Sequence, residues 1–486
     1  MNRLYPHAET GIGNSGEPPC ETLASVSPFS RRELLTAATS CVGGLAGGAL
    51  FGACASRPVS PATGGAPVPN DAVIVVGAGM AGLAAARTLR DAGRPVCVVE
   101  ARDRIGGRVH TDRGWGVPLE LGASWIHGTT DNPVLELARR ANAQLVATDY
   151  YGWAELAVDP ALPPLHYDSA MWRAFVERAR GGAAGASLGA AVRAAAARER
   201  ISAVERAELA FYLTTEVTDE YAADPDDLSA NAFDKGDDAT GDQDVVTNGY
   251  DALPRQLADG LPIVLNSPVT AITQRRDNVV VRTTGRTYEG PAAIVTVPLG
   301  VLKSQTIAFD PPLPDEHAHA VRALGFGVLA KSFFRFDKRH WRTDNAFYQY
   351  LGAEGESWAQ WFTLPGAAGP IAVAFNGGAR GRTVESWPPE RQLVEASPVA
   401  RRIFGDQVAL TAARTSAWSL DPFARGAYSF HAPGSGIDDR LRLRQPIGER
   451  VYLAGEAVGA DNPATVTGAV VSGRYAANQV LQRLNG

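Results

Sequence analysis

Three glycines and one glutamate have the types and spacing needed to bind the phosphates and ribose of a dinucleotide. Gly77, Gly79 and Gly82 follow a short β-branched run at residues 73–76 and precede a segment of helical composition. Glycines in this pattern allow a tight turn, bring backbone N–H groups to a pyrophosphate at a helix N-terminus, and permit close helix–strand packing. Glu100 lies 21 residues after Gly79, where an acid accepts hydrogen bonds from ribose hydroxyls. The whole frame predicts a dinucleotide-binding site.

A second glycine-rich turn follows the ribose acid directly and reads Arg102-Asp103-Arg104-Ile105-Gly106-Gly107-Arg108. A nicotinamide-dependent enzyme does not need this turn. Further distinctive blocks occur in order along the chain, at residues 119–128, 248–257, 296–303, 453–456 and 463–469. Together with the turn, they resemble the flavin-containing amine oxidase superfamily, which includes polyamine oxidases, lysine-specific histone demethylases and monoamine oxidases. The resemblance is greatest to bacterial polyamine oxidase-like members.

The resemblance implies FAD as the cofactor. Ala427 stands where monoamine oxidases carry the cysteine that binds flavin, so FAD is expected to be non-covalent. In the family, the arginine at the Arg108 position neutralises a FAD phosphate, the backbone at Val269 holds adenine, and the glutamate at Glu456 bonds ribityl or phosphate-side groups. The residues expected to contact FAD are Gly77, Gly79, Gly82, Glu100, Arg102, Gly107, Arg108, Gly122, Ala123, Ser124, Trp125, Val269, Trp418, Gly455, Glu456, Thr465 and Val466.

Four side chains match catalytic or substrate-contacting positions of the family. The family places a lysine at Lys331, bonded through water to flavin N5, and the chain has only 4 lysines beside 42 arginines. A lysine whose stem lies in an apolar strand can have a lowered pKa. Tyr428 and Thr465 match the pair that flanks the amine, and His127 matches a histidine that contacts substrate in animal polyamine oxidases. The competing interpretation gives these side chains packing or structural roles alone.

These residues predict FAD-dependent oxidation of an amine C–N bond by hydride transfer to flavin N5. The imine is then hydrolysed to an aldehyde and an amine, and H₂O₂ forms if O₂ accepts the electrons. Eleven acidic residues and one lysine between Glu216 and Asp244 favour a polyamine or secondary amine, although helix caps and a solvated loop explain the same acids equally well. The alternatives are an L-amino-acid oxidase, a cyclic-amine or monoamine oxidase, and a redox-inactive flavin-binding scaffold.

The elements that position these residues indicate an α/β fold. We expect a Rossmann-like FAD-binding domain interleaved with a substrate-binding domain made of a sheet and helices. The expected FAD-binding stretches are residues 71–130, 241–304 and 433–486, and the expected substrate-binding stretches are 131–240 and 305–432.

The N-terminal segment is interpreted as a targeting signal. Arg31 and Arg32 precede an uncharged, Ala/Gly-rich stretch that ends in Ala53-Cys54-Ala55. This pattern predicts a twin-arginine export signal at residues 1–55, a linker at 56–70, and a periplasmic or extracellular location. A membrane anchor, through the apolar stretch or a lipid on Cys54, is the alternative. Past the signal only Cys97 remains, so no internal disulfide is expected.

The composition excludes several classes of protein. The chain has 486 residues, of which 45% are hydrophobic and 20% charged, values that exclude a disordered or fibrous protein. Its net charge of −6 argues against nucleic-acid binding. The sequence has no Cys/His cluster typical of a metal site. The expected partners are therefore a small-molecule amine and O₂ or another electron acceptor.

Overall fold

The structure is a computed structural model, and it describes residues 69, 71–183, 185–236, 239–353 and 357–485. These residues belong to one compact unit. The predicted export signal at residues 1–55, with Cys54, and all of the predicted linker at 56–70 except Pro69 lie outside the described residues. Export by the twin-arginine route therefore stays a prediction.

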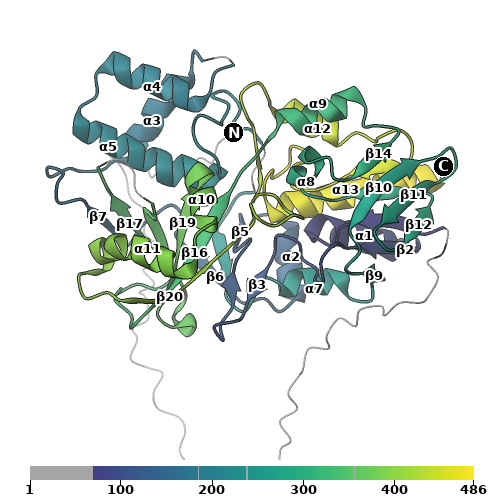
Figure 1. Cartoon of the computed structure of the whole chain (residues 1–486), viewed down its shortest axis with the longest axis horizontal. Helices are drawn as coiled ribbons and strands as arrows, with labels where there is room; N and C mark the ends of the chain where they lie inside the picture. Colours follow the sequence, from purple (N-terminus) through teal and green to yellow (C-terminus); the bar gives the residue numbers. More distant parts are fainter. Residues whose placement is uncertain (1–68, 70, 184, 237–238, 354–356, 486) are drawn as a thin grey trace, which may run out of the picture. The chain divides into compact units, whose positions relative to one another are not determined.

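A five-stranded parallel sheet carries the glycine motif (Figure 1). Its strands come from separate stretches of the sequence, in the spatial order β22 (Val451–Leu453), β13 (Ala293–Val295), β1 (Val73–Val76), β2 (Val96–Val99) and β9 (Ile263–Val264). All residues of the first four are buried, as expected for short apolar strands covered on both faces. The mixed α/β fold predicted from the sequence is confirmed.

Helices cover one face of this sheet. They are α1 (Met80–Asp91), α2 (Pro133–Arg140), α7 (Ala252–Ala258) and α13 (Val466–Asn485). Alternate strand residues such as Val73 and Val75 pack into their core. Helices α1 and α13 lie side by side, and Gly473 permits this because a Cβ there would approach the Ala81 carbonyl oxygen to 2.1 Å.

A second sheet packs on the opposite face, where Ile74, Val76 and Cys97 point. It contains β12 (Thr287–Gly290), β11 (Val279–Thr283), β10 (Val269–Gln274) and β14 (Ala308–Asp310). Three helices border it: α8 (Leu299–Lys303), α9 (Asp315–Ala323) and α12 (Ile437–Leu443). Side chains of α2 and α9 thus pack in the two cores on either side of the five-stranded sheet. The expected boundaries at residues 131 and 305 instead assign both helices to the substrate-binding domain.

A six-stranded sheet forms the centre of the other half. Its order is β20 (Leu410–Thr415), β16 (Leu329–Phe336), β19 (Ile371–Gly377), β18 (Gln360–Thr363), β17 (Ala346–Leu351) and β7 (Glu155–Val158). Helix α11 (Pro389–Phe404) packs against Phe334 and Phe336, and α10 (Gly378–Glu385) follows β19 directly. Phe333 points to the other face, where it meets Trp125. Strand β16 can therefore present Lys331, two residues away from Phe333, on that same face.

Helices gather at the far end of this half, at the upper left of Figure 1. They are α3 (Ser169–Arg180), α4 (Leu188–Glu199) and α5 (Ala203–Tyr212), followed by a π-helical turn η1 (Leu213–Thr218) and the short α6 (Asp219–Tyr221). π-Helical turns are rare and occur often at functional sites. This turn carries Glu216, and α6 carries Asp219, which contacts Gly377 at the end of β19.

Three small sheets connect the two halves. They pair β3 (Thr111–Asp112) with β4 (Leu119–Glu120), β15 (Gly325–Phe326) with β21 (Ser429–Phe430), and β5 (Trp125–His127) with β8 (Gln243–Val246), which also pairs with β6 (Leu145–Thr148). Residues 263–269 do not form one continuous strand, because β9 ends at Val264 and β10 starts at Val269. The break occurs because Asn266 adopts a left-handed φ of 52°.

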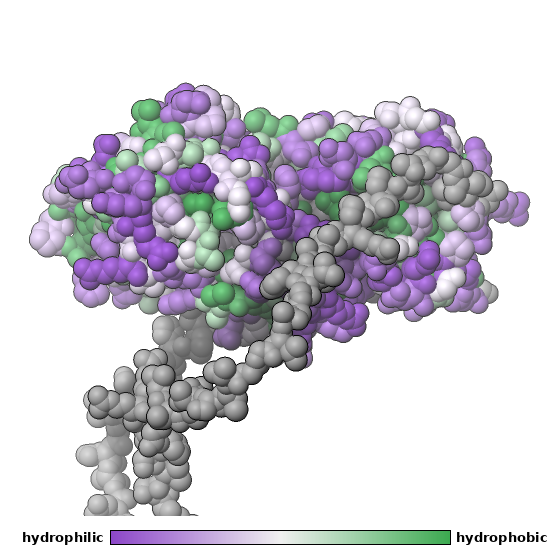
Figure 2. Space-filling view, turned by 90° about the horizontal axis from the view of Figure 1, so that it is seen from below, coloured by the Kyte–Doolittle hydropathy of each residue, from purple (hydrophilic) through white to green (hydrophobic). Residues whose placement is uncertain are grey.

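Hydrophilic side chains dominate the face seen in Figure 2, and hydrophobic residues form only small separate groups on its uncovered part. Large apolar side chains that are exposed, such as Val394 and Leu420, are scattered in the sequence. Across the part of the chain that the structure describes, no helix is both long and apolar enough to cross a membrane.

Candidate active site

The glycine turn between β1 and α1 leaves space where a ligand's phosphates would lie. Gly77 has a φ of 104°, which favours glycine, and a Cβ at Gly82 would lie 2.0 Å from the Gly77 carbonyl oxygen. Gly79 precedes α1, and a Cβ there would meet no atom within 4 Å. The turn is therefore tight where the chain packs on itself and open at the N-terminus of the helix, as a pyrophosphate requires.

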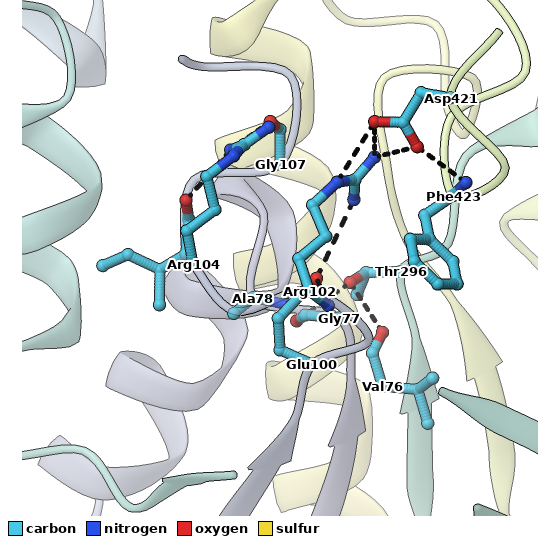
Figure 3. Close-up of polar contacts among 11 residues, drawn as sticks. Val76, Gly77, Ala78, Glu100, Arg102, Arg104, Gly107, Thr296, Asp421 and Phe423 are labelled. Carbon is cyan, nitrogen blue, oxygen red and sulfur yellow. Dashed lines mark hydrogen bonds and ion pairs between the residues drawn. The ribbon is translucent and has the colours of Figure 1, made fainter. Parts of the chain in front are cut away.

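Glu100 lies at the end of β2 with its carboxylate directed at the glycine turn (Figure 3). It is buried, its Oε2 accepts a hydrogen bond from Ala78 N at 2.7 Å, and its Oε1 accepts one from Arg102 N at 2.9 Å. Each carboxylate oxygen keeps a second lone pair for a ribose hydroxyl. Ser267 N donates to the Glu100 carbonyl oxygen at 2.8 Å, which places the start of β10, at Val269, beside this acid.

The second glycine turn packs on the first. A Cβ at Gly107 would lie 3.2 Å from Gly79 Cα, so glycine allows the two turns to meet. Arg108 follows and donates from Nη1 to Ala427 O at 2.7 Å and to Glu456 Oε1 at 2.8 Å. Arg108 thus lies at the edge of the dinucleotide site with its charge balanced by Glu456. Arg102, by contrast, forms its side-chain contacts with Asp421 and Glu100.

Glu456 belongs to a buried polar network that sequence reasoning missed. Its Oε2 accepts hydrogen bonds from the backbone N and the hydroxyl of Ser429, at 3.3 and 2.5 Å, and that hydroxyl accepts one from Arg440 Nη1 at 2.8 Å. Arg440 Nε donates to His431 Nε2 at 2.8 Å. Burial and the Arg440 charge lower the pKa of His431 to about 4, so its Nε2 can accept while Nδ1 donates to Ala232 O.

The same network keeps Glu456 ionised. Burial raises the pKa of Glu456, but the charges of Arg108 and Arg440 outweigh burial, and the net pKa shift is downward. Gly455, directly before it, has a φ of 148°, and a Cβ there would meet nothing within 4 Å. The carboxyl ends of β1 and β22 therefore both leave open space, bordered by Glu100, Arg108 and Glu456, that suits a dinucleotide with ribose hydroxyls and phosphates.

Lys331 is buried in β16 and anchored by residues 119–128, which we call the flavin-facing segment because Gly122–Trp125 are expected to contact FAD. Its Nζ donates to Glu120 O at 2.6 Å and Gly122 O at 2.8 Å, and it bonds the hydroxyl of Ser124. These three protein acceptors use the three donors of an ammonium group, so this conformation leaves none for the water that the family resemblance implied. Nζ also lies 5.8 Å from the centre of the Trp125 ring.

A second buried charge accompanies Lys331. Glu120, on β4, accepts hydrogen bonds from Tyr250 N at 2.9 Å and from the Thr111 hydroxyl at 2.8 Å. Burial lowers the pKa of Lys331 and raises that of Glu120, and each charge opposes the other's shift. The alternation Leu119-Glu120-Leu121 was the available signal for a buried acid here.

The predicted flavin-facing segment lies against aromatic side chains. A Cβ at Gly122 would lie 1.7 Å from the Arg108 carbonyl oxygen, and Ala123 N donates to that oxygen at 3.3 Å. Trp418 Nε1 donates to Leu121 O at 2.8 Å. Trp125 lies among aromatic rings, and its Nε1 is buried without a hydrogen-bond partner. Trp418 therefore packs on this segment from a distant part of the chain, whereas Trp125 is part of the segment itself.

Tyr428 lies beside the short helix α6, which follows the π-helical turn. Its hydroxyl donates to the carbonyl oxygens of Asp219 and Glu220, both at 3.1 Å. The Glu220 carboxylate accepts a hydrogen bond from the Tyr150 hydroxyl at 3.1 Å, and the Tyr150 ring contacts His127 edge-on at 5.2 Å. Glu220 thus contacts Tyr428 through its backbone and Tyr150 through its carboxylate, and Tyr150 contacts His127, so these four residues from four parts of the chain lie close together. This arrangement favours a cation-binding role for part of the acidic stretch.

Asp219 is buried and Glu216 is half-buried, and His127 has a structural contact of its own. Burial raises the pKa of Asp219 to about 7, although Oδ1 accepts a hydrogen bond from Gly377 N at 2.7 Å. Burial also raises the pKa of Glu216, against the charge of Arg173. His127 Nδ1 lies 2.8 Å from Gln243 Oε1 across the β5–β8 pair, so this histidine is held in place as well as near Tyr150.

Thr465 caps the last helix. Its hydroxyl donates to Asn462 O at 2.7 Å and accepts a hydrogen bond from Gly468 N at 3.0 Å. Val466 is the first residue of α13, whose N-terminus carries a partial positive charge. The structure thus gives Thr465 a capping role, which the family resemblance did not include.

Comparisons with known proteins identify the family. A family model described as flavin containing amine oxidoreductase matches residues 80–481. Polyamine oxidase 2 of Arabidopsis thaliana is 32% identical over 441 residues, which cover 85% of this chain and 89% of that protein. Lysine-specific histone demethylase 2 of Homo sapiens is 30% identical over 441 residues, which cover 85% of this chain and 53% of that protein.

Solved structures confirm the fold. A putrescine oxidase bound to putrescine superposes with a TM-score of 0.68 and 21% identity, covering 85% of this chain and 99% of that one. The expectation from the sequence motifs is therefore confirmed at the level of the family: the chain belongs to the flavin-containing amine oxidases and is an amine oxidoreductase that uses a flavin.

Proposed function

We propose that this enzyme oxidises a C–N bond of a polyamine or other secondary amine and holds FAD without a covalent bond. The observation that carries the substrate class is the contiguous set of Tyr428, Glu220, Tyr150 and His127. An extended cation with a second nitrogen fits a site that combines a carboxylate with aromatic rings. Similarity to polyamine oxidase 2 supports the same substrate class.

FAD would lie across the carboxyl ends of β1 and β22. Glu100 would accept hydrogen bonds from ribose hydroxyls, Gly79 and Gly455 supply the open space, and Arg108 would balance phosphate charge. The bound flavin would supply the electron sink for hydride transfer from the amine. Ala427 cannot form a thioether, which supports non-covalent binding.

The chain's own side chains would orient the amine and control charge. Tyr428, fixed by two carbonyl oxygens, would hold the reacting nitrogen in place, and the aromatic surroundings would exclude water. Lys331 would hold a proton beside the segment that faces the flavin, on a buried amine whose pKa is lowered. The reacting nitrogen must be neutral, so flavin reduction is expected to accelerate as pH rises.

Replacing Glu220 with glutamine tests the substrate class. We expect Glu220→Gln to lower kcat/KM for spermidine at least tenfold, because it removes a charge-assisted contact with a distal ammonium worth about 1.5–3 kcal/mol. Benzylamine lacks that second nitrogen and should lose much less. The matched control is Asp242→Asn, which removes an exposed acid from the same acidic stretch. Steady-state kinetics with both amines measure the difference, and equal losses for both would refute a cation-binding role for Glu220.

A further inference from the structure

An irregular connection, residues 418–428, joins β20 to β21 and touches both ends of the proposed FAD site. Near its start, Trp418 Nε1 donates to Leu121 O, and near its end Ala427 O accepts a hydrogen bond from Arg108 at 2.7 Å. It finishes at Tyr428, whose hydroxyl contacts helix α6. The 418–428 connection therefore reaches from the dinucleotide turns to the side chains proposed to hold the amine.

Asp421 fastens the middle of this connection to Arg102 (Figure 3). Arg102 Nη2 lies 2.9 Å from both carboxylate oxygens of Asp421, and Nε lies 3.3 Å from Oδ2. The guanidinium also lies over the Phe423 ring, 5.5 Å from its centre. Asp421 Oδ1 accepts a further hydrogen bond from Phe423 N at 2.7 Å. The Asp421 carboxylate thus bonds the backbone within the connection and also forms the ion pair with Arg102.

The same arginine contacts the ribose acid. The backbone N of Arg102 donates to Glu100 Oε1 at 2.9 Å, and its Nη1 lies 3.8 Å from that oxygen. The Arg102 and Asp421 side chains are only 12% and 24% exposed, so their ion pair is poorly screened by water. Glu100, Arg102 and Asp421 form a continuous polar chain from the dinucleotide site to the connection.

We propose that Asp421 is a positioning residue that holds the 418–428 connection in place beside the dinucleotide site through its two-oxygen contact with Arg102, and so retains FAD. This inference rests on the proposed binding of FAD. It gives Arg102 two roles, in the ion pair with Asp421 and in the cofactor site. Removing one partner of a half-buried ion pair leaves the other charge uncompensated, so loss of Asp421 should free both Arg102 and the connection. FAD would then leave more easily, although no residue predicted to contact FAD has changed.

A second arginine–aspartate pair provides a matched control. Arg180 and Asp234 form two contacts of 2.7 Å, their side chains are 9% and 25% exposed, and Arg180 lies over the Phe233 ring at 4.7 Å. This pair resembles Arg102–Asp421 in geometry and burial, but Arg180 lies at the end of α3, among the helices of the half built around the six-stranded sheet. Asp234→Asn should therefore lower the free energy of unfolding about as much as Asp421→Asn does, but it should leave the 418–428 connection in place.

The test compares FAD release from the wild-type holoenzyme, Asp421→Asn and Asp234→Asn after dilution of each holoenzyme, followed by the rise in fluorescence of free FAD. A second readout is tryptic cleavage after Arg425, an exposed residue of the connection. We expect Asp421→Asn to release FAD at least tenfold faster and to be cut at Arg425 faster, and Asp234→Asn to match the wild type in both. Equal release and cleavage in Asp421→Asn and the wild type would overturn the proposal while FAD binding stands. Wild-type protein that binds no FAD would instead refute the proposed function.

Discussion

Protein carrying Gly79→Val should fold normally and contain almost no FAD. A Cβ at this position would meet no protein atom within 4 Å, and the backbone has φ −75° and ψ 179°, which valine adopts without strain. The new side chain would instead occupy the space proposed for the pyrophosphate at the start of α1. We expect FAD affinity to fall at least 100-fold, or about 2.7 kcal/mol, with little change in the melting temperature of the apoprotein.

The measurement is flavin content after acid precipitation. Non-covalent FAD from the wild type should appear entirely in the supernatant. The control is Gly436→Val, because Gly436 also precedes a helix, α12, with an extended backbone and open space around a Cβ, but far along the chain from the glycine turn. It should retain FAD. A Gly79→Val protein with normal flavin content would show that the ligand does not approach this turn.

Lys331→Met should slow flavin reduction by amine or reoxidation by O₂ at least tenfold, since loss of about 1.4 kcal/mol of charge stabilisation suffices. Its Nζ is the buried cation held against Glu120, Gly122 and Ser124. Because burial lowers the pKa of Lys331, the proton is present at low pH and is lost as pH rises through the lowered value. The wild-type reoxidation rate should therefore fall with rising pH, and the variant's rate should not.

Stopped-flow measurement of both half-reactions across pH distinguishes this role from packing. Lys303→Met is the control, since Lys303 Nζ likewise donates to a backbone oxygen, that of Arg322, at 2.9 Å. It should leave both rates and the pH profile unchanged. If Lys331→Met kept wild-type rates and the wild-type pH profile, Lys331 would serve the structure alone.

The sequence was sufficient for those parts of the fold and site that depend on local pattern. Residues 73–100 predict strand, glycine turn, helix, strand and acid, because each step is specified by nearby residues, and β1, α1 and β2 follow that order. Lys331 was expected in an apolar strand, and it lies in β16, Leu329–Phe336. The order of the strands in the five-stranded sheet depends instead on pairing between strands that are distant in the sequence, so local patterns do not specify it.

Contacts between distant side chains could not be read in the same way. Asp421 meets Arg102 across more than 300 residues, and nothing near either residue indicates the other. The Arg440–His431 contact depends on how α12 packs, and the Glu120 carboxylate is satisfied by Tyr250 and Thr111 from other segments. The left-handed backbone of Asn266, which separates β9 from β10, is likewise not indicated by the neighbouring residues.

The most direct test of the proposed function is anaerobic reduction of the bound flavin by a panel of amines. The purified holoenzyme is mixed with spermine, spermidine, an acylated polyamine, benzylamine, a cyclic amine and common L-amino acids, and loss of the oxidised flavin absorbance is followed. We predict that a polyamine reduces the flavin fastest, and that its rate rises with pH as the reacting nitrogen loses its proton. Faster reduction by a monoamine, a cyclic amine or an L-amino acid would contradict the polyamine assignment, and no reduction by any of them would contradict amine oxidation itself.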